Sequence, residues 1–157
     1  MNLFGRKRKG GVEAPRKIER LAWDPKYSVR IEKIDAQHRE LFAVMNRIAD
    51  LHESGSNDLF PILQDLVQYA AEHFRAEEMV MMQVKYYGFK DQSDQHGQFM
   101  EKVQGFLSAY KEQDDRLTHR MLIYIHDWLL KHTTQADMQY ADFLVRSGSL
   151  PALRGEA

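Results

Sequence analysis

Apolar residues recur every three or four positions along most of the chain from Trp23 onward, the spacing of an amphipathic helix. A first helix is predicted from Asp35, whose carboxylate can cap its start, to about Ser54. Its inward positions are Leu41, Phe42, Met45, Ile48 and Leu51, preceded by Ile34. The run Ser-Gly-Ser-Asn at 54–57 ends this segment.

Three more long helical segments and a short one follow. Asn57 or Asp58 can cap the second, with Pro61 in its first turns. The Tyr-Tyr-Gly run at 86–88 is interpreted as a surface break after it. The predicted ranges are about 57–85, 93–112, 115–131 and 137–146, the last stopping before Gly148. With no strand-like alternation, the pattern predicts an all-α protein, an up-down-up-down four-helix bundle with an extended N-terminal arm and a short C-terminal helix.

The expected organisation is a flexible basic arm at 1–20, one bundle domain at 21–147 and a tail at 148–157. The arm holds seven Lys or Arg against two Glu, a net charge of +5, whereas the whole chain carries −1. Two interpretations are open: a tether that touches anionic lipid or an acidic partner, or a solvated tail. Nucleic acid is not expected, because the rest of the chain is acidic.

Composition removes several classes of function. With no cysteine, the chain has no disulfide, thiolate zinc site, iron–sulfur cluster or thiol nucleophile. No apolar run reaches the roughly 18 residues that span a bilayer, and no signal-peptide core follows the basic start, so we expect a cytoplasmic protein. Phosphate-binding loops, nucleophile elbows and zinc-protease motifs are also absent from the sequence.

A set of histidines and carboxylates shares the helical spacing. His73 and Glu77 are four residues apart and project from one helix face. His132 and Asp137 are five apart, so they converge only if the helix ends or distorts between them, for which Thr133–Thr134 is the expected place. With His38 and His96, six such residues fall on the inward faces of the predicted helices. Imidazole and carboxylate donors suit iron, and a carboxylate can bridge two ions, so a buried two-metal site is predicted.

These residues stand in motifs that resemble those of the bacteriohemerythrins. The opening stretch is Trp23-x3-Tyr27-Ser28-Val29-x-Ile31-x2-Ile34-Asp35-x-Gln37-His38. The motifs His73-Phe74-x2-Glu77-Glu78, His96-x2-Phe99 and Trp128-x3-His132-x4-Asp137-x2-Tyr140 follow in the same order. The resemblance covers about residues 21–145.

The resemblance implies two irons in the bundle core, bridged by an oxo or hydroxo group and by two carboxylates, here Glu77 and Asp137. One iron takes two imidazoles, His38 with His132 or His73, and keeps an open place for dioxygen. These assignments are what the family pattern implies for this chain.

The second iron takes three imidazoles in the family, two of them from the third helix. Those two positions are Gln92 and His96 in this sequence. An amide oxygen is a weaker donor to ferrous iron than imidazole. Three outcomes are open: Gln92 binds through its oxygen, a water takes its place, or the site holds one metal poorly.

Neighbouring residues are given lesser roles. Phe42, Phe74 and Trp128 are expected to pack in the core and to wall the small-molecule pocket, keeping it dry. Glu78 is expected beside the ligands or in solvent. Three histidines outside the motifs, which are His52, His119 and His126, are not expected to bind metal, and the last two are placed on polar faces. Of Met79, Met81 and Met82, at least one should face solvent.

Three functions follow as hypotheses, and the sequence does not determine the oligomeric state. The first is a non-enzymatic di-iron protein that binds dioxygen or another small diatomic ligand for carriage, storage or sensing. The second is an enzyme-like protein in which the altered iron site reacts with peroxide, nitric oxide or ferrous iron, with weak oxidase or peroxide-type activity. The third is a partner-binding bundle that the basic arm docks and the metal regulates.

Overall fold

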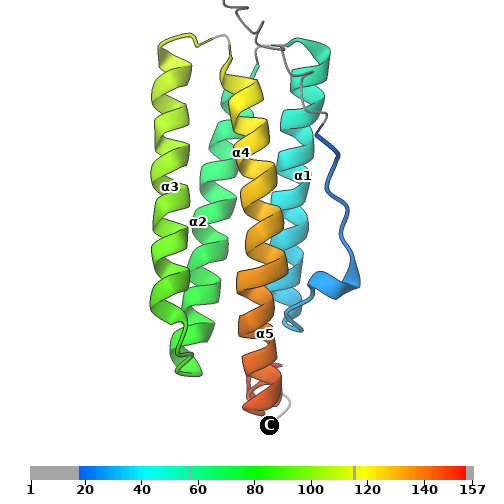
Figure 1. Ribbon diagram of the computed structural model, residues 1–157, viewed down its shortest axis with the longest axis vertical. Helices are drawn as coiled ribbons and strands as arrows, with labels where there is room; N and C mark the ends of the chain where they lie inside the picture. The colour runs from blue at the N-terminus through cyan, green and yellow to red at the C-terminus, as the bar shows by residue number, and fades with distance from the viewer. Residues whose placement is uncertain (1–17, 57, 115, 155–157) are drawn as a thin grey trace, which may run out of the picture.

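The computed structural model describes residues 18–56, 58–114 and 116–154, and its four long helices lie side by side (Figure 1). Within these residues no strand is present, so the predicted all-α bundle with up-down-up-down topology is confirmed. The helices are α1 (Glu32–Ser54), α2 (Phe60–Gln83), α3 (Phe89–Lys111), α4 (Leu117–Lys131), α5 (Asp137–Arg146) and α6 (Leu150–Arg154).

A π-helical turn, His132–Ala136, joins α4 to α5, so the two form one long rod (Figure 1). It lies where the sequence requires a distortion between His132 and Asp137, and it includes Thr133–Thr134. The short α5 ends at Arg146 as predicted. The following α6 lies in the segment that the sequence assigns to the tail, and it was not predicted.

A layer of polar side chains divides the apolar core into two clusters. On α1, Ile34 belongs to one cluster and Leu41 to the other, and His38 lies between them. The same order holds on α2 and across the α4–α5 junction, where Glu77 and Asp137 lie between residues of the two clusters. The apolar packing on both sides therefore fixes the height of this polar layer in the bundle.

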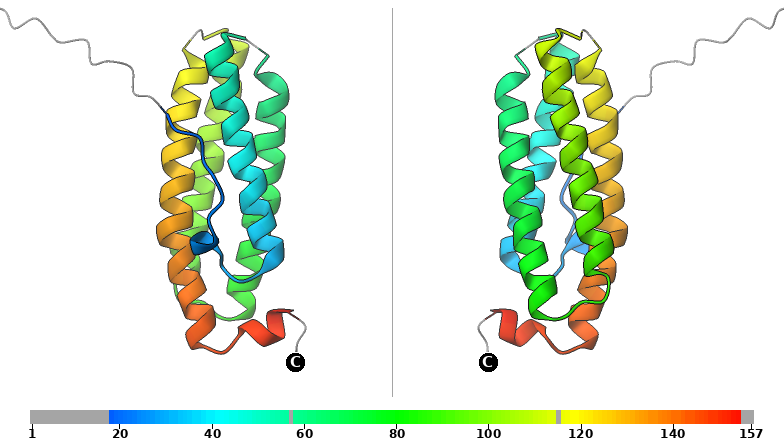
Figure 2. Two further views of the ribbon diagram at one scale, coloured as in Figure 1. Left: turned by 90° about the vertical axis from the view of Figure 1, so that its right-hand side faces the viewer. Right: turned by 90° about the vertical axis from the view of Figure 1, so that its left-hand side faces the viewer.

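The segment before α1 runs lengthwise along α1 and α4 (Figure 2). The Arg20 guanidinium pairs with Asp50 of α1, and Leu21 exchanges two hydrogen bonds with the Asn46 amide. Arg20, the last residue of the expected flexible arm at 1–20, thus contacts α1. Residues 1–17 of this arm lie outside the described residues.

The first helix begins three residues before the predicted cap. Asp35 lies inside the first turn of α1, where it is buried, and does not cap the helix. Its carboxylate instead accepts hydrogen bonds from the Ser28 hydroxyl at 2.5 Å and from the Val29 backbone N–H at 2.9 Å. Asp35 therefore anchors the segment that covers the bundle.

The third helix also begins earlier, at Phe89 instead of Ser93, which places Gln92 in its first turn. The turn before α3 contains Tyr86, which was predicted at the surface but is buried against Tyr140. A Cβ at position 88 would lie 2.7 Å from the Tyr86 ring, so this turn needs Gly88.

The second helix begins at Phe60 without a side-chain cap, so the predicted cap at Asp58 is wrong; its alternative Asn57 lies outside the described residues. Pro61 occupies the first turn, as predicted. Within the described residues, no helix combines the length and the hydrophobicity of a membrane span.

We expect the substitution Asp35→Ala to lower the free energy of unfolding by about 1–3 kcal/mol, because the buried Val29 N–H and the Ser28 hydroxyl lose their acceptor. Urea denaturation followed by circular dichroism measures this change. The exposed Glu40 on the same helix supplies the control Glu40→Ala, and equal unfolding midpoints for the two variants would contradict the anchoring role.

Candidate metal centre

All seven sequence-predicted ligand positions come together between the two apolar clusters. Each is at most 3% exposed. They come from α1, α2 and α3 and from the α4–α5 junction: His38, His73, Glu77, Gln92, His96, His132 and Asp137. The structure therefore brings all seven residues into one buried polar layer.

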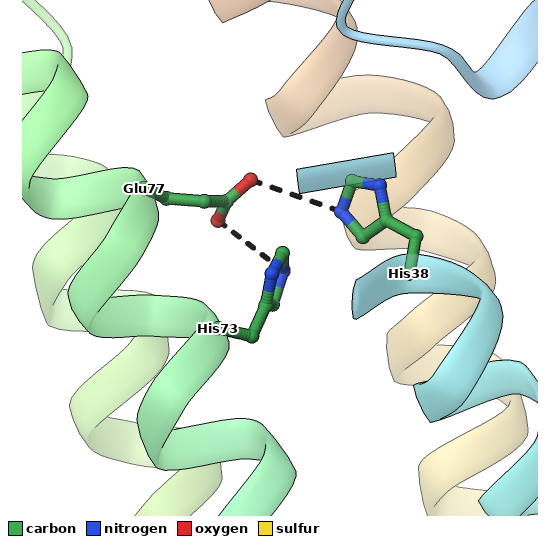
Figure 3. Close-up of side chains that lie close together, drawn as sticks. All are labelled: His38, His73 and Glu77. Carbon is green, nitrogen blue, oxygen red and sulfur yellow. Dashed lines mark ion pairs between the residues drawn. The ribbon is translucent and has the colours of Figure 1, made fainter. Parts of the chain in front are cut away.

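Glu77 is shared by two groups of histidines. Its Oε1 lies 3.7 Å from His38 Nε2, and its Oε2 lies 3.5 Å from His73 Nε2 (Figure 3). The same Oε2 lies 3.4 Å from His96 Nε2 and 3.9 Å from His132 Nε2. Each histidine pair with Glu77 offers three ligand atoms within 4.8 Å of one another. The arrangement pairs His38 with His73, an assignment that the sequence alone left open.

Asp137 spans the same two groups. Its Oδ2 lies 3.2 Å from His38 Nε2, and its Oδ1 lies 3.1 Å from His132 Nε2. The Gln92 amide nitrogen donates to Asp137 Oδ1 at 3.5 Å, which is a long bond. Each of the two carboxylates thus faces imidazoles from both histidine pairs.

The π-helical turn accounts for the position of Asp137. The Asp137 backbone N–H donates to the carbonyl of His132, five residues earlier. This wider turn returns a residue five positions on to the same face, where a regular α-helix would rotate it away. The Thr134 hydroxyl donates to the Leu130 carbonyl at 2.7 Å, which occupies a backbone acceptor within the distorted turn.

Several of the converging polar atoms lack a hydrogen-bond partner among the described residues. They include both carboxylate oxygens of Glu77, Oδ2 of Asp137 and the Gln92 carbonyl oxygen. Burying carboxylates in this way costs several kcal/mol unless cations compensate. The donor set therefore fits a pair of metal ions.

The pKa shifts of His73 and Glu77 agree with metal binding. Burial lowers the pKa of His73 to about 3, so this imidazole is neutral near pH 7, as a metal ligand must be. Burial would raise the pKa of the Glu77 carboxyl, but the surrounding imidazoles hold it well below its usual range. Glu77 is therefore an anion at the centre of the bundle.

Glu78 supports one ligand from outside the site. The His96 ring lies with Nδ1 3.0 Å from the Glu78 carboxylate, and Glu78 is partly exposed. If Nδ1–H donates to Glu78, the Nε2 lone pair is left facing Glu77. This arrangement fixes the tautomer and strengthens the donor, as carboxylate partners of metal-bound histidines do. Glu78 therefore lies beside the ligands, one of its two predicted placements.

Aromatic rings close the site on two sides. Phe74 stacks on His96 with ring centroids 4.0 Å apart, and Trp128 stacks on His132 at 4.3 Å. Trp23 stacks on His38 at 6.0 Å, a role that the sequence motif contained but that we did not predict. Phe42 contacts the Trp23 ring, so Trp23 lies between Phe42 and the His38 imidazole. Phe74, Trp128 and Trp23 therefore contact the ligand histidines directly, and the role of Phe42 as a pocket wall stays a prediction.

Three further observations concern residues that are not among the predicted ligands. Tyr140 is fully buried with its hydroxyl unpartnered among the described residues, and burial and the nearby carboxylates raise its pKa. His126 was predicted on a polar face but is buried against the N-terminal segment. Met79 and Met82 are exposed, which confirms the prediction for at least one of the three methionines.

An up-down bundle whose core holds two shared carboxylates among four imidazoles defines a class of helical proteins with paired metal ions. The family model described as the Hemerythrin HHE cation binding domain matches residues 29–144. The chain belongs to the hemerythrin family.

Individual relatives agree with this assignment. Bacteriohemerythrin of Clostridium acetobutylicum is 26% identical to this chain, over 76% of the chain and 98% of the relative. Myohemerythrin of Sipunculus nudus is 29% identical, over 75% of the chain and 88% of the relative. Myohemerythrin-1 of Phascolopsis gouldii is 28% identical, over 78% of the chain and 92% of the relative. Membership of this family makes the chain a non-haem iron protein, and the domain implies a di-iron cofactor.

We expect the substitution Glu78→Ala to lower iron affinity by about tenfold or more, because His96 loses the acceptor that orients it. The variant Glu78→Gln keeps an acceptor oxygen and should lose less. Competition with a ferrous chelator measures both, and Glu101→Ala on the exposed face of α3 is the control. Wild-type affinity in both Glu78 variants would show that His96 is held without this contact.

Proposed function

We propose that this protein binds dioxygen reversibly at a di-iron centre, for carriage, storage or sensing, and is not primarily an enzyme. The observation that carries the proposal is the position of Glu77, which lies within reach of both histidine pairs. One carboxylate shared in this way is what two adjacent ions require, whereas a single ion would use only one pair.

Each histidine pair would supply the ligands of one iron. His38 and His73 would hold one iron and leave it an open position, and His96 and His132 would hold the other with Gln92 as a further donor. Asp137, with Oδ2 toward His38 and Oδ1 toward His132, would be the second bridge. Bound ferrous iron supplies the electrons that dioxygen binding needs.

The protein's own contribution is to position the ligands and exclude water. Phe74 and Trp128 stack on imidazoles of the second set, and Trp23 stacks on His38 of the first. Rings in these places keep the small-molecule pocket apolar, which disfavours protonation and loss of the bound ligand. Tyr140 keeps its proton, because burial raises its pKa, and adds no charge to the pocket.

A specific feature favours the second candidate function, reaction with peroxide, nitric oxide or ferrous iron. Gln92 occupies a position where the family pattern has imidazole, and its carbonyl oxygen is unpartnered among the described residues. A neutral amide stabilises oxidised iron less than imidazole does. The iron beside Gln92 would therefore have a raised potential and exchange its ligand more readily.

The third hypothesis stays a prediction. The basic arm that would contact an acidic partner or membrane surface lies mostly outside the described residues, and the cytoplasmic location is likewise an expectation from the sequence.

The proposal predicts two irons per chain in protein purified from iron-replete cells, measured by metal analysis. Replacing the shared carboxylate by Glu77→Ala should remove both ions, whereas Glu72→Ala on the exposed face of the same helix should keep them. Retention of two irons in the Glu77 variant would exclude the bridging role.

Exposure of the anaerobically reduced protein to oxygen should then give a charge-transfer spectrum that vanishes on deoxygenation. Rapid irreversible oxidation, or turnover with peroxide or nitric oxide, would support the second candidate instead.

Restoring the imidazole with Gln92→His should tighten iron binding and slow autoxidation by about tenfold or more, because a stronger donor joins the second iron. Chelator competition and the rate of spectral change after aeration measure the two effects. The control is Gln104→His, at an exposed position of the same helix. Unchanged metal content and spectrum would show that Gln92 does not lie next to iron.

A further inference from the structure

The metal centre is closed in this conformation. His38 and His73, the pair that would leave an iron its open position, are each 1% exposed. The other ligand positions are buried as deeply. Ions and ligands therefore reach the site only when some part of the bundle moves aside.

Residues 18–27, here called the strap, run along α1 and α4 beside this site (Figure 2). The strap contains no α-helix, only the short 3₁₀ turn Pro25–Tyr27. Among the described residues, Leu21 alone joins the strap backbone to a helix, through its two hydrogen bonds with the Asn46 amide. The elements that carry the ligands are long helices and the helical α4–α5 junction. The strap is therefore the part that opens at the lowest cost in free energy.

Trp23 separates the ligand His38 from a cavity beneath the strap. The cavity has a volume of about 580 Å³ between the strap and α4, and the Trp23 ring is part of its lining. The same ring stacks on His38 with ring centroids 6.0 Å apart. Leu21, Trp23 and Tyr27 pack against the core but are only partly buried, so moving them exposes less apolar area than moving a helix. Displacement of one aromatic ring would thus join the cavity to His38.

The charge of this cavity suits a metal cation. Among the described residues that line it, Glu19 and Asp24 are anionic and Arg20 is cationic. Arg20 is paired with two carboxylates of α1, and Asp24 with Lys26, so the total charge of these groups stays negative. A rival entrance is the hollow of about 330 Å³ between α3 and the α4–α5 junction, where the charged lining residue among those described is Lys131. A divalent cation is attracted to the first entrance and repelled by the second.

We propose that the strap is a gate through which divalent metal ions enter and leave the His38–His73 pair. The two hydrogen bonds of Asn46 hold the gate closed, and the Trp23 ring fills the opening. The Asp35 carboxylate is the hinge, because it fixes the end of the strap next to α1. The gate needs the two-metal site of the proposed function, but it does not need dioxygen binding.

A gate has a kinetic signature that a ligand-positioning role lacks. The variant Asn46→Ala loses the bonds to Leu21 whether or not metal is bound, so the closed state is weakened equally in both forms. Uptake and release of metal should then both accelerate by the same factor, about tenfold, while Kd stays as in the wild type. Stopped-flow absorption of the full-length, metal-free protein mixed with Co²⁺ measures uptake. Transfer of bound Co²⁺ to excess EDTA measures release.

Two further measurements locate the gate. In hydrogen exchange followed by mass spectrometry, amides of the strap should exchange faster than those of α1, and Asn46→Ala should accelerate exchange in the strap alone. Trp23→Ala removes the ring that fills the opening and should also accelerate metal uptake. The double variant should gain less than the product of the two single effects, because both substitutions act on one barrier.

Two variants outside the strap are the controls. Val103→Ala weakens the buried core on α3, which lies on the far side of the bundle from the strap, and so tests general loosening (Figure 2). Gln98→Ala changes the lining of the rival entrance. Both should leave the two metal-transfer rates as in the wild type. Circular dichroism confirms that each variant is folded.

Unchanged metal-transfer rates in Asn46→Ala, or a changed Kd without matched changes in the two rates, would overturn the gate. Equal acceleration by Val103→Ala or Gln98→Ala would do the same, and so would failure of the wild type to take up Co²⁺. Dioxygen binding is tested separately. Matched acceleration in protein that does not bind dioxygen reversibly would uphold the gate while that function fails.

Discussion

The structure depends on the burial of two carboxylates at the centre of a helical bundle. Glu77 and Asp137 are both 0% exposed, and the only basic groups facing them closely among the described residues are imidazoles. Neutral imidazoles cannot balance two negative charges, so the layer is stable only with cations or bound protons. Metal binding and folding are therefore coupled in this protein, and ions that bind the folded bundle add directly to its stability.

Three local features bring the ligands to this layer. The α4–α5 junction turns Asp137 back toward His132, and the early start of α3, directly after the close approach of Tyr86 to Gly88, puts Gln92 on a helix in phase with His96. The third feature is Asp35, which fixes the segment carrying Trp23 across His38. Apolar clusters above and below then hold all of these groups at one height.

Much of this arrangement could be predicted, because ligand spacing and helix periodicity are local properties. The spacing of His73 and Glu77 defines a shared helix face, and the five-residue separation of His132 and Asp137 requires a distortion there. The partner of His38 could not be predicted, because it depends on how the helices pack. The buried Tyr86 was missed for the same reason: its contacts with Tyr140 come from a helix far along the chain.

The π-helical turn holds one residue more than a regular α-helix needs to bring His132 and Asp137 to the same face. If this turn refolded as α-helix with the chain length unchanged, Asp137 and every later side chain would rotate by about 100°. The carboxylate of Asp137 would then leave the core, and so would the buried faces of Tyr140 and Leu144. Removal of one residue from the turn would have the opposite result, because Asp137 would follow His132 by four positions and an unbroken α-helix would keep both on one face.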